Sequence, residues 1–211
     1  MIKKEYQQYA ESHTTPESKL MFRLNRETNL KTVYPRMLSG HYQGKFLEMI
    51  SMMIRPRRVL EVGTFTGYST ICLAKGLKQD GLLYTIDVNP EMEDIFTNYF
   101  KEAGLYLKIN THFGKALEII PGLQETFDLV FIDADKENYL NYYQMVFDKV
   151  AEGGFILADN AFWDGHVMKR KKDKETQGIA DFNEFVQNDT RVENILLTIR
   201  DGLMLLRKNP S

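Results

Sequence analysis

The chain has 211 residues, of which 43% are hydrophobic and 27% charged, a balance typical of a globular protein with one buried α/β core. Its formal net charge of −2 argues against a whole-surface attraction to nucleic acid or to an anionic membrane. No segment approaches the ~20 apolar residues of a membrane span, and the N-terminus lacks an apolar core of signal-peptide length, so we expect neither membrane insertion nor export by that route.

The first 57 residues contain amphipathic helical stretches, which Pro16 and the Tyr34-Pro35 region separate. We expect them to form a helical cap over one rim of a catalytic core at 58–211, with the whole of 1–211 being a single domain. From Arg58 onward, short β-rich runs alternate with segments of helical period. This alternation is typical of a mostly parallel sheet covered by helices on both faces.

The alternation predicts strands and helices along most of the chain. The strands are expected at 59–62, 83–88, 109–113, 129–133 and 155–158, and helices near 68–78, 90–103, 138–150 and 179–187. Two last strands, at 194–199 and 203–207, flank Asp201-Gly202, a dipeptide that indicates a hairpin. The sequence therefore predicts an α/β fold with a doubly wound, mostly parallel seven-stranded sheet and an antiparallel C-terminal hairpin at its edge.

Cysteine usage indicates a reducing environment. Cys72 is the one cysteine of the chain, so no intramolecular disulfide can form. Because Cys72 falls within a predicted helix, we expect a reduced interior thiol, which fits a cytoplasmic protein.

The first predicted strand runs into a glycine-containing turn, Glu61-Val-Gly63-Thr-Phe-Thr-Gly67-Tyr-Ser69. Such a strand, turn and helix start hold nucleotide-like ligands at the carboxyl end of a sheet, because glycine lets the backbone approach closely. The loop lacks the third glycine of the dinucleotide motif, and Glu61 suits a cationic amino group better than a pyrophosphate. Asp87, which ends the second strand, suits ribose hydroxyls. The loop favours an amino-acid nucleoside, with a tight turn and a surface acid as the alternative.

Oxygen-bearing side chains follow the fourth and fifth predicted strands. Asp133 ends the fourth strand, and Asp159 and Asn160 end the fifth. Because parallel neighbours present their carboxyl ends at one edge, we expect these side chains to converge there. Two carboxylates and an amide oxygen suit Mg²⁺, Mn²⁺ or Ca²⁺ rather than zinc. The alternative is that each aspartate only caps a helix or turn.

Three segments together resemble the cation-dependent O-methyltransferases, a family that includes caffeoyl-CoA and, more distantly, catechol O-methyltransferases, and most closely its bacterial branch. The segments are Glu-Val-Gly-Thr-Phe-Thr-Gly-Tyr-Ser (61–69), Phe-Ile-Asp-Ala-Asp-Lys-Glu-Asn-Tyr (131–139) and Asp-Asn-Ala-Phe-Trp-Asp-Gly (159–165). The resemblance implies a Rossmann-like class I methyltransferase, with S-adenosylmethionine as cofactor and a divalent cation (Mg²⁺, alternatively Mn²⁺ or Ca²⁺). It further implies methyl transfer to a hydroxyl of a small aromatic acceptor, catechol-like or hydroxycinnamoyl-like, and a homodimer.

The resemblance also implies roles for individual residues. Cofactor contacts are implied for Ser39, Glu61, Gly63, Thr64, Ser69, Asp87, Ala116, Asp133 and Asp135. Metal ligation is implied for Asp133, Asp159 and Asn160, catalysis for Lys136 as general base together with Asp133, and a substrate site for Trp163 and Asp164. Asp164 stands where plant relatives often have Asn, and Lys115 also departs from the family pattern, so no plant substrate is carried over.

Lys136 has two interpretations. A partly buried lysine beside a cation would have a depressed pKa, which suits a base at neutral pH. The alternative is a solvent-exposed lysine at the start of a helix.

Other functions stay open. The basic run Lys169 to Lys172 could contact phosphates, which would suit a methyltransferase for 5-hydroxyuridine at the tRNA wobble position, although such a run is more often a solvated loop. A non-catalytic module that binds S-adenosylmethionine is a second alternative, against which the acidic residues and Lys136 argue. The glycine spacing disfavours an NAD-dependent oxidoreductase.

Overall fold

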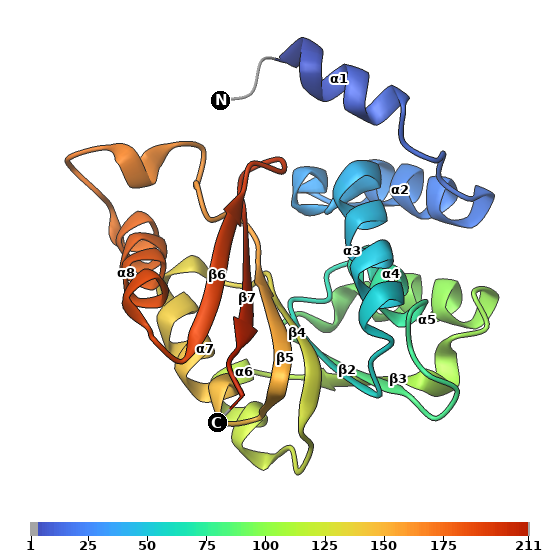
Figure 1. Cartoon of the computed structure of the whole chain (residues 1–211). Coiled ribbons are helices and arrows are strands. Elements are labelled where there is room, and N and C mark those ends of the chain that lie inside the picture. Colours follow the sequence, from blue (N-terminus) through green and yellow to red (C-terminus); the bar gives the residue numbers. More distant parts are fainter. Residues whose placement is uncertain (1–3, 211) are drawn as a thin grey trace.

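The computed structural model describes residues 4–210 and is built around one seven-stranded sheet, with the strand order β3-β2-β1-β4-β5-β7-β6 (Figure 1). The strands are β1 (Arg58–Val62), β2 (Leu82–Asp87), β3 (Ile109–Phe113), β4 (Phe127–Ile132), β5 (Val150–Ala158), β6 (Val192–Leu197) and β7 (Leu203–Lys208). The strands β1 to β5 pair in parallel, while β7 pairs antiparallel with both β5 and β6. The predicted doubly wound sheet with an antiparallel C-terminal hairpin is confirmed.

Helices cover both faces of this sheet (Figure 1). The α-helices of the described chain are α1 (Lys4–Ser12), α2 (Lys19–Lys31), α3 (Gly40–Ile54), α4 (Tyr68–Ala74), α5 (Glu93–Glu102), α6 (Ala116–Ile119), α7 (Tyr139–Phe147) and α8 (Lys174–Asn188), of which α1 lies beyond α2 and away from the sheet. The helices α2 to α5 share one hydrophobic cluster with the sheet, and α6 to α8 share the other. Within 4–210, no helix has the length and apolar character needed to cross a membrane.

Side chains alternate between the two clusters along each central strand, as the pleat of a strand requires. In β1, Leu60 and Val62 face α6 to α8, whereas Val59 faces α2 to α5. Glu61 is therefore on the same face as Val59 and beneath α4. Cys72 in α4 is free and buried, as expected.

Two elements, β5 and α8, begin well before the residues that the sequence indicates, 155 and 179. The strand β5 begins at Val150, where a shift in register between Phe127 and Leu129 of β4 accommodates extra residues. The helix α8 begins at Lys174 because Asp173 caps it, with its carboxylate accepting a hydrogen bond from the Thr176 amide. Polar residues fill the first turn of α8, so the apolar period that predicted this helix becomes visible only further along.

The strand order reverses between β1 and β4, whose neighbours lie on opposite sides of them. At such a point the connections leave in opposite directions and open a crevice at the carboxyl ends of the strands. The glycine turn after β1 and the aspartates after β4 and β5 all lie at this edge, so the topology brings the predicted site residues together.

Candidate active site

Glu61 is a fully buried carboxyl next to the glycine turn. Its Oε2 accepts hydrogen bonds from the hydroxyls of Thr70 in α4 and Thr85 in β2. Its Oε1 has no hydrogen-bond partner among the described residues. Burial raises the pKa of Glu61 to about 7, although the nearby hydroxyls of Ser69, Thr70 and Thr85 lower it. A buried acceptor without a partner is costly unless a ligand supplies a donor, and Glu61 is not the surface acid of the alternative interpretation.

Gly63 brings the turn after β1 into contact with the end of β4. Its φ of 105° is unfavourable for any residue with a side chain, and a Cβ atom there would lie 1.9 Å from the carbonyl oxygen of Asp133. The amide of Asp133 in turn donates to the carbonyl of Val62. Close approach of two backbones is thus one requirement that glycine meets at this position.

Asp87 holds the glycine turn from the end of β2. Its Oδ2 accepts from the amides of Thr64 (3.0 Å) and Phe65 (2.8 Å), and its Oδ1 accepts from the amide of Asn89 (2.9 Å). Thr64 adds a hydroxyl contact to Thr85. Each carboxylate oxygen has further acceptor capacity, so Asp87 can fix the turn and still accept hydroxyl donors from a ligand.

The remaining residues with implied cofactor contacts differ in their surroundings. Ser39, Ser69 and Ala116 are buried, at the starts of α3, α4 and α6 respectively. Asp135 is exposed, and its carboxylate accepts from Tyr142 and Asn138 in the segment that follows it. Within residues 4–210, Asp135 makes no hydrogen bond to the other candidate cofactor residues.

Asp133 and Asp159 follow neighbouring strands at equivalent positions. Ile132 pairs with Ala158 at the last register position of β4 and β5, and the amide of Asp159 then donates to the Ile132 carbonyl (3.0 Å). Asp159 is almost fully buried, at 2% exposure. Burial and the nearby Asp133 carboxylate raise the pKa of Asp159 to about 6. Such repulsion between acids falls when a cation lies between them.

Asn160 completes the predicted ligand set and has a left-handed backbone, with φ of 57°. Its side-chain nitrogen donates to Asp201 (3.1 Å), so the side-chain oxygen is the atom that could bind a cation. Within the described residues no three His, Cys, Asp or Glu side chains form a metal-binding group. The candidate set instead consists of two carboxylates and one amide oxygen, which are hard ligands of the kind that Mg²⁺ and Mn²⁺ accept.

Lys136 is buried, at 8% exposure, so the exposed-lysine alternative is wrong. Its Nζ donates to Asp133 Oδ1 (2.9 Å) and to the Tyr139 hydroxyl (2.7 Å), and lies 5.8 Å from the centre of the Trp163 ring. Burial lowers the pKa of Lys136, but the Asp133 carboxylate and Tyr139 raise it by more, to a value above the usual range. The depression of this pKa was expected for a lysine beside a cation and stays a prediction; in the chain alone, Asp133 pairs with Lys136 directly and the pKa is raised.

Trp163 and Asp164 lie in a loop with a tightly turned backbone. Both have positive φ, 46° and 50°, which is rare for residues other than glycine. The Asp164 side chain is exposed, and its amide donates to Asp201 (2.6 Å). The partly buried Trp163 packs against the hydrophobic core and lies beside Lys136.

Three polar residues around this loop were not among the site residues predicted from the sequence. Gln43 in α3 contacts Asp159, Arg200 contacts Gln43, and Asp201 holds Asn160 and Asp164. The Asp201-Gly202 dipeptide predicted the hairpin, and its position near the loop could not be read from sequence. Gln43 lies 116 residues from its partner, and no motif marks it.

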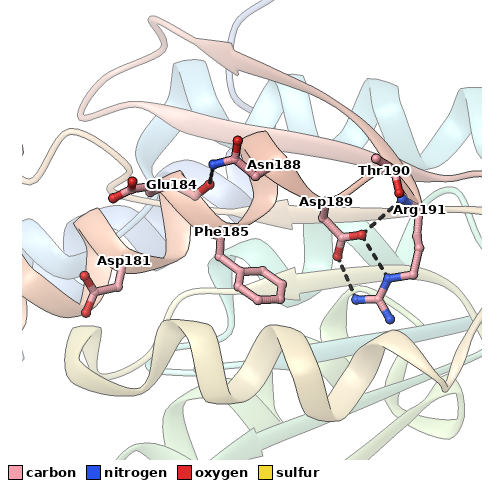
Figure 2. A pocket seen from close by; sticks show the side chains of 7 residues that line it. All are labelled: Asp181, Glu184, Phe185, Asn188, Asp189, Thr190 and Arg191. Carbon is pink, nitrogen blue, oxygen red and sulfur yellow. Dashed lines mark hydrogen bonds and ion pairs between the residues drawn. The ribbon is translucent and has the colours of Figure 1, made fainter.

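Two surface hollows lie away from these residues. Figure 2 shows one, of ≈ 510 Å³, between the end of α8 and the following turn, where Asp189 pairs with Arg191. The other, of ≈ 1120 Å³, lies beside α1 and α2. Neither includes Glu61, Asp87, Asp133 or Asp159, and neither gathers acid, base and cofactor-binding groups. The side chains at the ends of the strands, rather than the volume of a surface pocket, identify the candidate active site.

Comparison with known proteins agrees with this geometry. Residues 11–209 match the family model described as O-methyltransferase. Caffeoyl-CoA O-methyltransferase 5 from Nicotiana tabacum is 31% identical, and that from Petroselinum crispum 32%, each alignment covering 96% of this chain and 90% of the relative. Two solved structures are also similar over nearly their whole length. The O-methyltransferase TomG from Streptomyces achromogenes, solved with S-adenosylmethionine, has a TM-score of 0.90 and 27% identity, and the match covers 99% of this chain and 100% of that one. The O-methyltransferase from Bacillus cereus, solved with S-adenosylhomocysteine, has a TM-score of 0.89 and 28% identity, and the match covers 97% of each chain.

Proposed function

This chain belongs to the O-methyltransferase family, and we propose that it transfers a methyl group from S-adenosylmethionine to a hydroxyl of a small aromatic acceptor with a divalent cation. The cofactor and the reaction type follow from the relatives as a group. The aromatic acceptor and the cation are the proposed parts. One observation carries them: Asp133, Asp159 and Asn160 follow adjacent strands beside the buried Lys136 and the Trp163 ring.

The glycine turn offers groups that fit S-adenosylmethionine. The unpartnered, buried Oε1 of Glu61 is an acceptor for a ligand that carries a charged amino group. Asp87 has acceptor capacity for ribose hydroxyls while it fixes Thr64 and Phe65. We therefore assign the cofactor to this turn, with Ser39, Ser69, Ala116 and Asp135 as further candidate contacts.

The acidic strand ends fit a divalent cation. Asp133 and Asp159 raise the local negative charge, and the amide oxygen of Asn160 faces no internal donor in the described chain. A bound cation would lower the pKa of an acceptor hydroxyl and so favour the oxyanion that takes the methyl group and releases S-adenosylhomocysteine. Asp133, Asp159 and Asn160 would hold that cation.

Lys136 is the proposed general base, which would take the proton from the acceptor hydroxyl. Its Nζ lies beside Asp133 and Trp163, at the border between the acid pair and the aromatic wall. Lys136 can act as a base only when Asp133 is engaged elsewhere, because direct pairing with Asp133 keeps its pKa high. Lys136→Met should lose turnover chiefly near neutral pH, while the affinity for S-adenosylmethionine is retained.

The acceptor class rests on the surroundings and on the relatives' names. The relatives are named for caffeoyl-CoA, whose caffeoyl group carries adjacent aromatic hydroxyls. Trp163 offers an aromatic surface, while the exposed Asp164 adds negative charge. We therefore propose a catechol-like or hydroxycinnamoyl-like acceptor.

A homodimer is proposed from the N-terminal helices. Large apolar side chains are exposed in this part of the chain, among them Phe22, Leu30, Met49, Met52 and Met53. Burial of such side chains against a second copy is favourable. The cytoplasmic location suggested by the sequence stays a prediction.

The decisive experiment is an acceptor screen with labelled S-adenosylmethionine, with and without chelator, on the parent and on Asp159→Ala. We expect turnover of a catechol or hydroxycinnamate, loss on chelation, and recovery with Mg²⁺ or Mn²⁺ in the parent only. The variant should lose roughly 10³-fold in turnover, since a metal contributes several kcal/mol to such a step, and should keep its affinity for the cofactor. Full activity in chelator would refute the metal. Transfer to tRNA alone, from a salt-sensitive complex, would replace the aromatic acceptor.

A further inference from the structure

Gln43 is a fully buried amide that connects the N-terminal helix α3 to the candidate metal ligands. Its Nε2 donates to Asp159 Oδ2 at 2.6 Å. The other oxygen of Asp159, Oδ1, accepts from the amide of Asn160 at 2.8 Å. Each carboxylate oxygen thus has one donor and keeps acceptor capacity for a further partner.

Arg200 determines which end of the Gln43 amide faces Asp159. One guanidinium nitrogen of Arg200, Nη1, donates to Gln43 Oε1 (3.3 Å) and to the carbonyl of Ser39 (2.6 Å). The other, Nη2, reaches the carbonyl of Arg36 (3.5 Å). A guanidinium can only donate, so the oxygen of Gln43 must face Arg200 and its NH₂ group must face Asp159.

We propose that Gln43 is a positioning residue for the metal ligand Asp159, and that Arg200 acts through Gln43 by fixing the orientation of its amide. This inference rests on the proposed function, because it concerns how the chain holds Asp159 for a divalent cation. Hydrogen bonds from outside the ligand set orient ligating groups, and their loss lowers metal affinity. A neutral amide suits this position, because a lysine or arginine at the same place would compete with the cation for the carboxylate.

The proposal gives α3 a part in the chemistry of the strand ends. Without Gln43, Asp159 would keep only the bond from the neighbouring Asn160 amide. Its carboxylate could then rotate about the bond to its Cβ atom, since a single donor fixes only one of the two oxygens. Gln43 prevents this rotation from the opposite side.

A purely structural role of Gln43 is the competing explanation, and cation affinity separates the two. The test variant is Gln43→Met, which keeps an unbranched side chain of similar length and removes the amide. The control is Ser51→Ala in the same helix, which removes a buried hydroxyl that donates to the carbonyl of Leu73 and lies away from Asp159. Each variant loses one buried hydrogen bond, so each should have a lower melting temperature. If the bond of Gln43 is only structural, that is the one effect expected of Gln43→Met, as it is of Ser51→Ala.

The measurement is calorimetric titration with Mn²⁺ alone, accompanied by the affinity for S-adenosylmethionine and by the melting temperature. Gln43→Met should bind Mn²⁺ roughly 10- to 100-fold more weakly, with cofactor affinity unchanged. Ser51→Ala should bind Mn²⁺ as the parent does. Equal Mn²⁺ affinity in parent and Gln43→Met would overturn the inference and leave the metal site intact. A parent that binds no Mn²⁺ would overturn the proposed metal dependence itself.

Arg200 supplies a second test that does not depend on the core. Arg200 is exposed in the turn between β6 and β7, so Arg200→Met leaves the core packing unchanged. The variant removes the donor to Gln43 Oε1, the bonds to the Ser39 and Arg36 carbonyls and a positive charge near Asp159. Release of the Gln43 amide should weaken Mn²⁺ binding roughly 2- to 10-fold, the worth of one modest hydrogen bond. The double variant Gln43→Met with Arg200→Met should bind as weakly as Gln43→Met alone, because Arg200 acts through Gln43. If the losses of Mn²⁺ affinity in the two single variants multiplied in the double variant, Arg200 would not act through Gln43. Unchanged Mn²⁺ affinity in Arg200→Met would contradict the proposed role of Arg200.

Discussion

The two halves of the candidate site are held in different ways. In the first, the glycine half (residues 61–67 with Asp87), Glu61 is held by neighbouring elements: Thr70 and Thr85 lie 9 and 24 residues from it, and the most distant side-chain partner is Thr28, 38 residues from Thr66. In the second, the aspartate half (residues 133–136 and 159–165), Asp159 depends on Gln43, 116 residues away, and Asn160 on Asp201, 41 residues away. The supporting contacts of the aspartate half thus span more of the chain than those of the glycine half.

The backbone differs in degree. The glycine half has Gly63, Gly67 and one residue with a side chain, Phe65, at positive φ, whereas the aspartate half has three residues with side chains there, Asn160, Trp163 and Asp164, beside Gly165. Such backbone conformations cost free energy in residues with side chains and persist only where their surroundings hold them. The aspartate half therefore depends on its supporting contacts, which is why single changes can test each half separately.

Gly63→Ala should have the largest effect on stability, because Gly63 lies where the glycine half contacts Asp133 of the aspartate half. The added Cβ would lie 1.9 Å from the Asp133 carbonyl oxygen at a φ of 105°. Strain and overpacking each cost about 1 to 3 kcal/mol, so we expect a loss of roughly 2 to 6 kcal/mol in the free energy of unfolding, measured by chemical denaturation.

Gly122→Ala is the matched control, since nothing lies within 4 Å of a Cβ at that position and its φ is not positive. It should change the free energy of unfolding by less than about 0.5 kcal/mol. A Gly63→Ala protein as stable as this control would show that the two backbones can separate without loss.

Glu61→Gln tests the glycine half through pH. Burial raises the pKa of Glu61 from 4.5 to about 7, so between these values the folded chain binds more protons than the unfolded chain. The free energy of unfolding therefore falls as pH rises through this window, by roughly 3 kcal/mol from Glu61 alone. The variant lacks this contribution.

Denaturation of ligand-free parent and Glu61→Gln at pH 4 and pH 8 measures that difference, because the other groups titrate in both proteins. The parent should lose more stability than the variant on going to pH 8. The same variant should bind S-adenosylmethionine more weakly. An identical pH dependence in the two proteins would mean that Glu61 titrates normally and is not a desolvated ligand acceptor.

Asp87→Ala should weaken S-adenosylmethionine binding by about 10- to 100-fold, since hydrogen bonds to a charged group contribute about 1.5 to 3 kcal/mol. The variant loses the proposed ribose acceptor and the bonds that fix Thr64 and Phe65. Glu152→Ala, on the exposed surface of β5, is the control with unchanged affinity. Calorimetry decides, and parent-like binding by Asp87→Ala would place the ribose elsewhere.

The same contrast explains how far the sequence could be read. The periodicity of hydrophobic residues and the turn dipeptide Asp201-Gly202 predicted the strands and the hairpin, because strands and turns depend mainly on residues that are neighbours in sequence. Glu61 and Asp87 could be assigned because strand ends fix where they lie. Gln43 and Arg200 could not, since only the packing of α3 against the hairpin brings them to Asp159. The pairing of Lys136 with Asp133 could not be read from the sequence either, and in the chain alone it outweighs burial and raises the pKa of Lys136.

Asp201→Ala should have the smallest effect and should confine it to the aspartate half. Asp201 accepts hydrogen bonds from the Asn160 side chain and the Asp164 amide, so its loss releases the loop that carries one metal ligand. Because Asp201 is only partly buried, water can replace some of these bonds, and we expect a loss of about 1 kcal/mol in the free energy of unfolding.

The sharper readout for Asp201 is the ratio of two affinities. Asp201→Ala should bind Mn²⁺ several-fold more weakly than the parent and bind S-adenosylmethionine equally well, because no hydrogen bond links Asp201 to residues 61–67 or Asp87 within the described chain. Thr198→Ala, an exposed change in the same turn, is the control. If the affinities for Mn²⁺ and for S-adenosylmethionine fell together, the hairpin would support the whole edge of the sheet. The glycine half and the aspartate half would then not be held separately.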